Sequence, residues 1–277
     1  MNPDYVQSLF GLKNKVALVT GGGGVLCRTL CRALGQLGVG VVVVDRNAEA
    51  AQRVAEEITG EGGEAIAVTG DVLERASLEA VRDAALAKFG CVDILINGAG
   101  GNNSQATTSP EVSFFNLPPD AIRGVFELNF IGTLLPCQVF GQLMAEQKEG
   151  CILNISSMNA FRPLTRIPAY SAAKAAVSNF TQWLAVHMAQ EYSPRIRVNA
   201  LAPGFFDTEQ NHFLLTDPVS GEPNPRSRTI LAHTPMNRFG LPEDLIGATV
   251  WLLSPSAAFI TGVVIPVDGG FSAYSGV

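Results

Sequence analysis

Basic residues are in the minority in this chain of 277 residues, with 19 lysines and arginines against 25 aspartates and glutamates. The formal net charge is therefore −6. A protein attracts a phosphate backbone through a basic surface, which this composition does not provide. We expect no nucleic acid among its partners.

The cysteines are few and lack the spacing of a metal site or a disulfide framework. They form no CxxC pair, their number is odd, and all lie in apolar segments: Cys27, Cys31, Cys91, Cys137 and Cys151. This pattern favours reduced, buried thiols. We expect no metal and a cytoplasmic location. Residues 1–15 also lack the basic start and apolar core of a signal peptide.

Charged residues make up only 16% of the chain, whereas hydrophobic residues make up 47%. So few charges indicate that part of the surface is buried between subunits, and we expect a homo-oligomer, either a dimer or a tetramer.

Residues 245–267 carry no charge and are long enough to cross a bilayer, but Pro255 and Pro266 interrupt them. A helix followed by a buried strand is the better interpretation, and we expect no membrane segment.

Apolar, strand-like runs alternate with helical patterns along the chain. The runs cover residues 15–20, 39–44, 65–69, 92–96, 151–155, 196–201 and 262–267. Parallel strands require helical crossovers, and an α/β core can reach this length undivided. The sequence predicts a single α/β domain over residues 1–277, a Rossmann-type doubly wound parallel sheet of about seven strands flanked by helices. Residues 101–119 are typical of a surface loop, and the proline-rich residues 205–239 of a substrate lid.

A strand, a glycine turn and a helix follow one another near the amino terminus, with four glycines at residues 21–24. This order presents free N–H groups and the positive end of a helix dipole to a phosphate. The second strand ends in Asp45, whose carboxylate suits a ribose diol and repels a 2′-phosphate. The adjacent Arg46 suits that phosphate. Electrostatics favour NAD, and Arg46 leaves NADP open as the alternative.

Ser157, Tyr170 and Lys174 form the most informative constellation. Tyr170 and Lys174 are four residues apart and lie on one face if residues from 168 onward are helical, although such pairs also occur on many solvated helices. The ammonium is expected to lower the pKa of the phenol toward neutrality. Ser157 follows a buried strand, at the carboxyl end where open α/β sheets bind ligands.

Together with the glycine turn and Asn97-Gly98-Ala99, these residues resemble the short-chain dehydrogenase/reductase family over essentially the whole chain. The resemblance implies that Tyr170 is the general acid/base, Lys174 lowers its pKa and holds the nicotinamide ribose, and Ser157 polarises a carbonyl. It also implies a proton relay supported by Asn129, in a helix that Pro136 disturbs.

The same resemblance implies a cofactor site. Its residues are Gly21, Gly23, Gly24, Val25, Leu26, Asp45, Arg46, Asp71, Val72, Asn97, Gly98, Ala99, Tyr170, Lys174, Pro203, Gly204 and Phe206. Val25 and Cys27 depart from the family pattern because they stand where it usually has glycine.

Four longer stretches resemble a D-mannonate oxidoreductase (fructuronate reductase) subgroup: TGGGGVL, SSMNAFRPLTRIPAYSAAK, LAPGFFDTEQNHFLLTD and VDGGFSAYSGV. This resemblance implies a sugar acid as the small-molecule substrate. We expect Ser157, Asn159 and Arg162 to contact it, because a guanidinium binds a carboxylate through two parallel hydrogen bonds. The other polar candidates are Asn102, Asn103, Arg166, Gln210, Asn211, Arg226 and Arg228.

Three alternative functions remain open from the sequence. Two are enzymes, a gluconate 5-dehydrogenase-like protein and a 3-oxoacyl-thioester reductase, of which the second requires an apolar acyl channel. The third is a nicotinamide-binding redox sensor without turnover. The complete set of Asn129, Ser157, Tyr170 and Lys174 argues against the sensor, since binding alone does not need all four residues.

Overall fold

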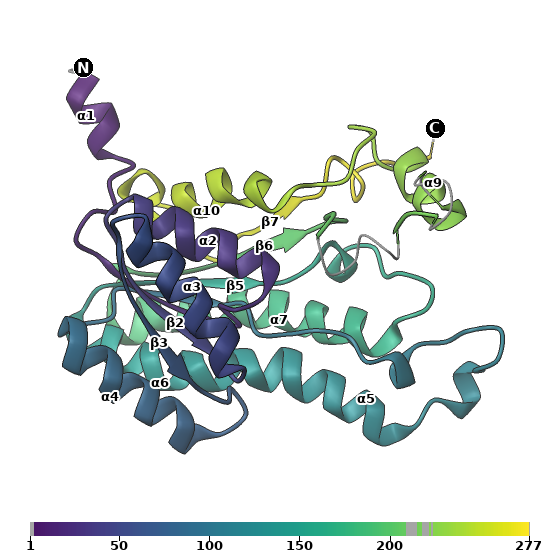
Figure 1. Ribbon diagram of the computed structural model, residues 1–277, viewed down its shortest axis with the longest axis horizontal. Coiled ribbons are helices and arrows are strands. Elements are labelled where there is room, and N and C mark those ends of the chain that lie inside the picture. The colour runs from purple at the N-terminus through teal and green to yellow at the C-terminus, as the bar shows by residue number, and fades with distance from the viewer. Residues whose placement is uncertain (1–2, 209–214, 218–221, 223, 277) are drawn as a thin grey trace.

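The structure is a computed structural model that describes residues 3–208, 215–217, 222 and 224–276. In this part of the chain seven strands form one parallel sheet (Figure 1). They are β1 (Val16–Thr20), β2 (Gly40–Asp45), β3 (Glu64–Thr69), β4 (Ile94–Asn97), β5 (Gly150–Ile155), β6 (Ile196–Pro203) and β7 (Val264–Val267). The order β3-β2-β1-β4-β5-β6-β7 reverses between β1 and β4. The predicted doubly wound sheet is confirmed, and β4 and β7 begin two residues later than expected.

Helices cover both faces of the sheet (Figure 1). One face packs against α2 (Val25–Gln36), α3 (Ala48–Gly60) and α10 (Ile246–Leu253). The other packs against α4 (Arg75–Phe89), α6 (Gly132–Gln147) and α7 (Pro168–His187). Strands covered on both faces must be apolar throughout, which explains why β1 and β2 appear in the sequence as continuous hydrophobic runs.

Two of the predicted helices differ from regular α-helices at one end. The helix that carries Tyr170 continues past α7 as a π-helical turn, Met188–Tyr192. The last helix begins as a 3₁₀ turn, Pro242–Leu245, in which the Asp244 carboxylate accepts a hydrogen bond from the Leu241 N–H at 2.8 Å. A short helix that was not predicted, α1 (Pro3–Ser8), projects from the amino-terminal end.

The long connections gather at the carboxyl end of the sheet (Figure 1). Residues 101–118 hold two short 3₁₀ turns, Ser104–Ala106 and Phe114–Asn116, before α5 (Pro119–Phe126). The segment 205–239 contains α9 (Pro225–Ala232). Gln210 and Asn211 lie outside the described residues.

Within the described residues, one helical run is long and apolar enough to cross a membrane, but it is Pro119–Gln147 rather than the stretch 245–267 considered above. Half of its most apolar window is buried inside the fold. Burial of this kind is typical of a core helix in a soluble protein, and α6 packs directly on the sheet.

Candidate active site

Ser157, Tyr170 and Lys174 come together at the end of β5. Ser157 follows that strand, while Tyr170 and Lys174 lie one turn apart on α7, which Pro168 begins. The Lys174 ammonium nitrogen is 5.7 Å from the centre of the Tyr170 ring. The sequence spacing therefore produces the predicted cluster of a hydroxyl, a phenol and an amine.

The prediction that Lys174 lowers the pKa of Tyr170 is wrong for the protein without a bound cofactor. Burial raises the pKa of Tyr170 above its ordinary value, and a hydrogen bond with Ser157 opposes that rise only in part. Burial also lowers the pKa of Lys174 to about 8, against a weaker opposing effect of Cys27. Loss of hydration disfavours the charged form of each group and outweighs the attraction that the sequence suggested.

Lys174 is held by the backbone of the strand beneath it. Its ammonium donates to the Ile155 carbonyl oxygen at 2.7 Å, and only 4% of the residue is exposed. The Ser156 hydroxyl donates to the Lys174 carbonyl at 3.1 Å. Both serines line the cavity, but Ser156 is tied to α7 by this bond, whereas Ser157 hydrogen-bonds with Tyr170.

Asn129 lies in a π-helical turn, Glu127–Ile131, immediately before the turn of α6 that contains Pro136. The predicted helix disruption is therefore present. The Asn129 amide donates to the carbonyls of Gly101 at 2.7 Å and Val125 at 2.8 Å, and its oxygen accepts from the Gly101 N–H at 3.2 Å. A Cβ on Gly100 would lie 2.7 Å from the Asn129 oxygen and 3.2 Å from the Lys174 ammonium. Asn129 therefore anchors the loop beside Lys174.

The glycine turn has the shape of a phosphate cradle. Gly21 has φ +64°, and a Cβ there would come within 2.8 Å of the Ala99 backbone. The Gly23 N–H donates to the Asp45 carboxylate at 3.1 Å, which ties the turn to the end of β2. No side chain caps the start of α2 at Gly24, so this helix end keeps N–H groups for a phosphate.

Cys27, which replaces a usual family glycine, is accommodated by a glycine elsewhere. Its sulfur occupies the space that a Cβ on Gly98 would need. The thiol is buried, and that burial raises its pKa to about 12, with Lys174 opposing and Asp45 reinforcing the rise more weakly. The side chain at position 27 and the missing side chain at position 98 are thus complementary.

Two adjoining cavities contain most of the predicted cofactor residues. One, of about 420 Å³, is lined among others by Val25, Leu26, Gly98, Ser157, Tyr170, Lys174, Pro203, Gly204 and Phe206. The other, of about 240 Å³, is lined among others by Gly21, Gly24, Asp45, Arg46, Asp71, Val72, Gly98 and Ala99. The two exceptions are Gly23, whose N–H donates to the Asp45 carboxylate, and Asn97, whose side chain donates to Asn154 on the next strand at 2.9 Å and so joins β4 to β5.

A third cavity, of about 750 Å³, is lined by Asn102 and Phe205, the chain neighbours of Gly101 and Phe206 in the first cavity. Its lining includes three of the predicted polar candidates, Asn102, Arg166 and Arg226. The sequence reasoning missed its other members: Thr107, Leu164, Thr165, Ile167, Phe205, Thr229, Ile230, His233 and Phe271. No local pattern marks these residues, which come from five separate stretches of the chain.

Of the other substrate candidates that the structure describes, Ser157 lines the first cavity, and four lie outside the lining of all three: Asn103, Asn159, Arg162 and Arg228. The Arg162 guanidinium donates to the Ser272 carbonyl at 3.1 Å, and Asn103 accepts from the Gln105 N–H at 2.9 Å. Asn159 is buried, and its side-chain oxygen has no hydrogen-bond partner in the structure. Arg228 lies on the exposed side of α9.

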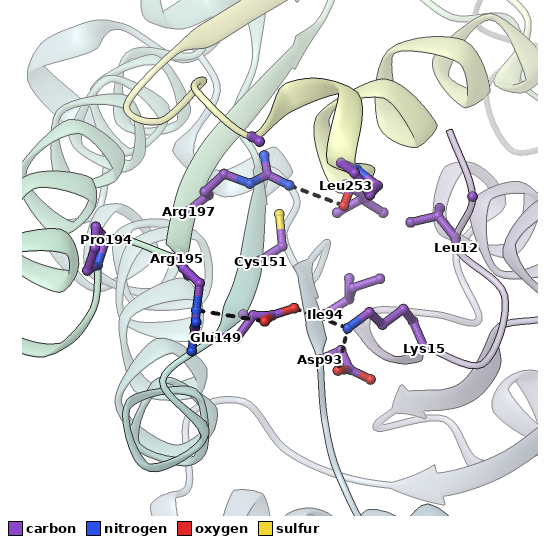
Figure 2. Close-up of a pocket in the computed structure, with 14 residues that line it drawn as sticks. Leu12, Lys15, Asp93, Ile94, Glu149, Cys151, Pro194, Arg195, Arg197 and Leu253 are labelled. Carbon is purple, nitrogen blue, oxygen red and sulfur yellow. Dashed lines mark hydrogen bonds and ion pairs between the residues drawn. The ribbon is translucent and has the colours of Figure 1, made fainter. Parts of the chain in front are cut away.

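A separate pocket of about 280 Å³ lies at the opposite, amino end of the strands (Figure 2). Lys15 pairs with Asp93 at 3.2 Å and with Glu149 at 3.3 Å, and Glu149 also lies 3.9 Å from Arg195. Arg197 donates to the carbonyls of Leu252 at 2.6 Å and Leu253 at 3.2 Å.

Fold and site together are those of an oxidoreductase with a dinucleotide-binding sheet and a tyrosine-lysine pair. The sequence pattern of the short chain dehydrogenase family matches residues 15–218, and the chain belongs to this family. It is 49% identical over 275 residues to the uncharacterized oxidoreductase UxuB of Bacillus subtilis, covering 96% of this chain and 98% of the relative. It is 33% identical over 259 residues to the 7alpha-hydroxysteroid dehydrogenase of Escherichia coli, covering 94% of each.

Solved structures support the same assignment. A Haemophilus protein provisionally named a D-mannonate oxidoreductase, solved with bound NAD, superposes with a TM-score of 0.92 at 50% identity and covers 96% of this chain and 98% of its own. A gluconate 5-dehydrogenase from Burkholderia cenocepacia, in complex with NADP and tartrate, superposes with a TM-score of 0.84 at 32% identity, covering 97% and 99%.

Proposed function

We propose that this enzyme interconverts a secondary alcohol and a ketone on a sugar acid, with the pair D-mannonate and D-fructuronate as the first candidate. The observation that carries the proposal is the cavity of about 750 Å³, whose lining mixes amide, hydroxyl and guanidinium groups with aromatic rings and includes chain neighbours of the residues that line the cavity with Tyr170. Several hydroxyl groups and one carboxylate need such partners. The similarity to the Haemophilus protein supports the same substrate.

We propose NAD as the cofactor. Asp45 lies at the end of β2 in the cavity that would hold the adenosine, where its negative charge disfavours a 2′-phosphate. The neighbouring Arg46 lines the same cavity and is the group that NADP would require. The glycine cradle and the uncapped start of α2 fit the pyrophosphate of either dinucleotide.

The residues around the reacting carbon have separable tasks in this proposal. The nicotinamide supplies or accepts the hydride. For reduction, Ser157 donates a hydrogen bond to the carbonyl oxygen and Tyr170 donates the proton, which its raised pKa keeps on the phenol at neutral pH. Lys174 places a positive charge beside that phenol, and Asn129 holds the loop that closes the site.

The segment 205–239 is proposed to cover the substrate, because Phe205 and α9 both line the large cavity.

We also propose that the chain forms a homo-oligomer in the cytoplasm. Exposed apolar side chains on α5 and α7 and in the turn after α7 support a subunit interface: Phe126, Trp183, Val186 and Tyr192. Light scattering tests the oligomer, and a monomeric mass would contradict it.

The substrate proposal is tested with a panel of hexonates, hexuronates, neutral polyols and 3-oxoacyl thioesters, each assayed with NAD(H) and NADP(H). We expect the highest kcat/KM for D-fructuronate reduction with NADH. Equal activity on mannitol and mannonate would contradict a sugar acid, and a preference for gluconate would favour the gluconate 5-dehydrogenase alternative that the Burkholderia structure supports. A preference for the thioester would favour the acyl reductase. If no substrate is turned over, the redox sensor would be favoured.

A further inference from the structure

The large cavity has an unusual charge for this chain. Among the residues that the structure describes, its lining contains Arg166, Arg226 and His233 and no aspartate or glutamate, although acidic residues outnumber basic ones in the sequence. Arg166 comes from the segment before α7 and Arg226 from α9, so two distant parts of the chain each contribute an arginine to the lining of one cavity.

Neither guanidinium has a hydrogen bond or an ion pair with any described residue. Other arginines do: Arg28, Arg32, Arg75, Arg82, Arg123, Arg195 and Arg238 pair with carboxylates. The charge of Arg166 is the weakest of the causes that shift the lowered pKa of Glu111, after its hydrogen bonds with Ser109 and its own backbone. Glu111 also lies outside the cavity lining. Two cations left without carboxylates beside one cavity create a field that favours an anionic ligand.

We propose that Arg166 and Arg226 together bind the substrate carboxylate and set the preference for sugar acids over neutral polyols. This inference rests on the proposed function and assigns the carboxylate site to this pair rather than to Arg162 or Asn159. The Arg162 guanidinium already donates to Ser272, and Asn159 carries no charge.

The position of the pair relative to Tyr170 fits this role. Neighbouring residues line the adjoining cavities: Gly101 and Phe206 line the one with Tyr170, whereas Asn102 and Phe205 line the one with the arginines. A substrate that spans both would place its carboxylate away from the carbon that is oxidised or reduced. The backbone near Arg166 is fixed, because its carbonyl accepts from the Thr108 N–H at 2.9 Å.

Arg226 is also badly placed for the stability of its own helix. It lies in the first turn of α9, after Pro225, where the helix dipole is positive and disfavours a cation. Asn224 caps this turn by accepting from the Ser227 N–H at 3.0 Å. An anion between the Arg166 and Arg226 guanidinium groups would relieve this repulsion and hold α9 over the substrate.

The experiment compares Arg166→Ala, Arg226→Ala and the double variant with Arg53→Ala, an exposed arginine on α3 that lies outside all the cavities described above. We expect KM for D-fructuronate to rise at least about tenfold in each single variant and about a hundredfold in the double variant, with kcat within about threefold. Affinity for NADH and the kcat/KM for the neutral ketose D-fructose should stay unchanged. Arg166→Lys should recover only part of the loss, because lysine lacks the planar fork.

A second readout needs no turnover: calorimetric binding of tartrate and D-mannonate to the enzyme in the presence of NADH. If the wild type prefers fructuronate and the double variant keeps that preference, the arginine assignment is overturned while the proposed function survives. If no sugar acid is turned over but the variants lose carboxylate binding, the proposed function fails and the arginine site stands. An equal KM rise in Arg53→Ala would also overturn the assignment.

Discussion

Two groups of cationic side chains lie at opposite ends of the same sheet and have opposite surroundings. At the amino end, Lys15 and Arg195 pair with carboxylates, and Arg197 donates to a set of carbonyls (Figure 2). At the carboxyl end, Arg166 and Arg226 face a cavity whose described lining residues include no carboxylate. Charges that are already paired have their partners within the fold, whereas charges without partners among the described residues remain free to attract a ligand.

Two lysines show the same difference in their pKa values. Burial would lower the pKa of Lys15, but the charges and hydrogen bonds of Asp93 and Glu149 together raise it. Burial lowers the pKa of Lys174 to about 8, and no carboxylate reverses that effect. The same residue type is therefore a structural cation at one end of the sheet and a titratable group at the other.

The largest expected effect is on catalysis at the carboxyl end. Tyr170→Phe removes the proposed proton donor and should lower kcat by at least about a hundredfold, within the usual range for a general acid. Fluorescence titration should show NADH binding within about twofold of wild type, since the substitution deletes one hydroxyl from a cavity wall. More than about a hundredth of the wild-type rate would contradict the assignment.

The second prediction concerns the contribution of Arg197, in the amino-end pocket, to the stability of the fold. Arg197 is only 9% exposed and donates to the carbonyls of Leu252, Leu253, Ser254 and Ile260. Arg197→Met removes these hydrogen bonds from a buried cation, and we expect the free energy of unfolding to fall by about 3 kcal/mol in urea titrations. Arg226→Ala, the control at the other end, should change it by less than about 0.5 kcal/mol. A larger loss of unfolding free energy in Arg226→Ala than in Arg197→Met would contradict the difference between the two ends of the sheet.

The two lysines should give opposite responses to pH. The lowered pKa of Lys174 means that the unfolded chain binds its proton more tightly, so burial of the ammonium costs stability below about pH 8. That cost disappears as pH rises toward the ordinary value of 10.5. Between about pH 7.5 and pH 9.5, wild type should gain about 2 kcal/mol of unfolding free energy relative to Lys174→Met.

Lys15→Met is the matched control for that experiment. The raised pKa of Lys15 means that its stabilisation is fully present below 10.5 and is lost only as pH rises through its higher folded value. Wild type and Lys15→Met should therefore keep a nearly constant difference between about pH 7.5 and pH 9.5. Parallel pH dependence of wild type and Lys174→Met would show that the ammonium is not buried as described.

The smallest expected effect concerns cofactor choice. Wild type should have a higher kcat/KM with NADH, and Asp45→Ala should narrow or reverse that preference because Arg46 can then meet a 2′-phosphate. A shift of about tenfold in the ratio of the two kcat/KM values corresponds to about 1.4 kcal/mol. Arg46→Ala should shift the ratio the other way. A wild-type enzyme that prefers NADPH tenfold would overturn the NAD proposal.

The local features of this protein could be read from the sequence. The apolar runs predict the strands, because the five inner strands are buried on both faces, whereas the edge strands β3 and β7 are only partly buried. The spacing of Tyr170 and Lys174 places them on one helical face. The glycine turn after β1 and the helix disruption near Pro136 also follow from residue types alone, since glycine and proline act on the backbone at their own positions.

Other features depended on the tertiary structure. The pKa of Tyr170 moves opposite to expectation because it depends on burial, which no spacing reports. Cys27 fits only because Gly98, far along the chain, lacks a side chain. Arg166 was one of four candidate arginines until the fold placed Arg226 beside the same cavity and gave Arg162 the Ser272 carbonyl as its partner. Sequence determines which groups are present, but their burial and partners arise from segments that meet only in the folded chain.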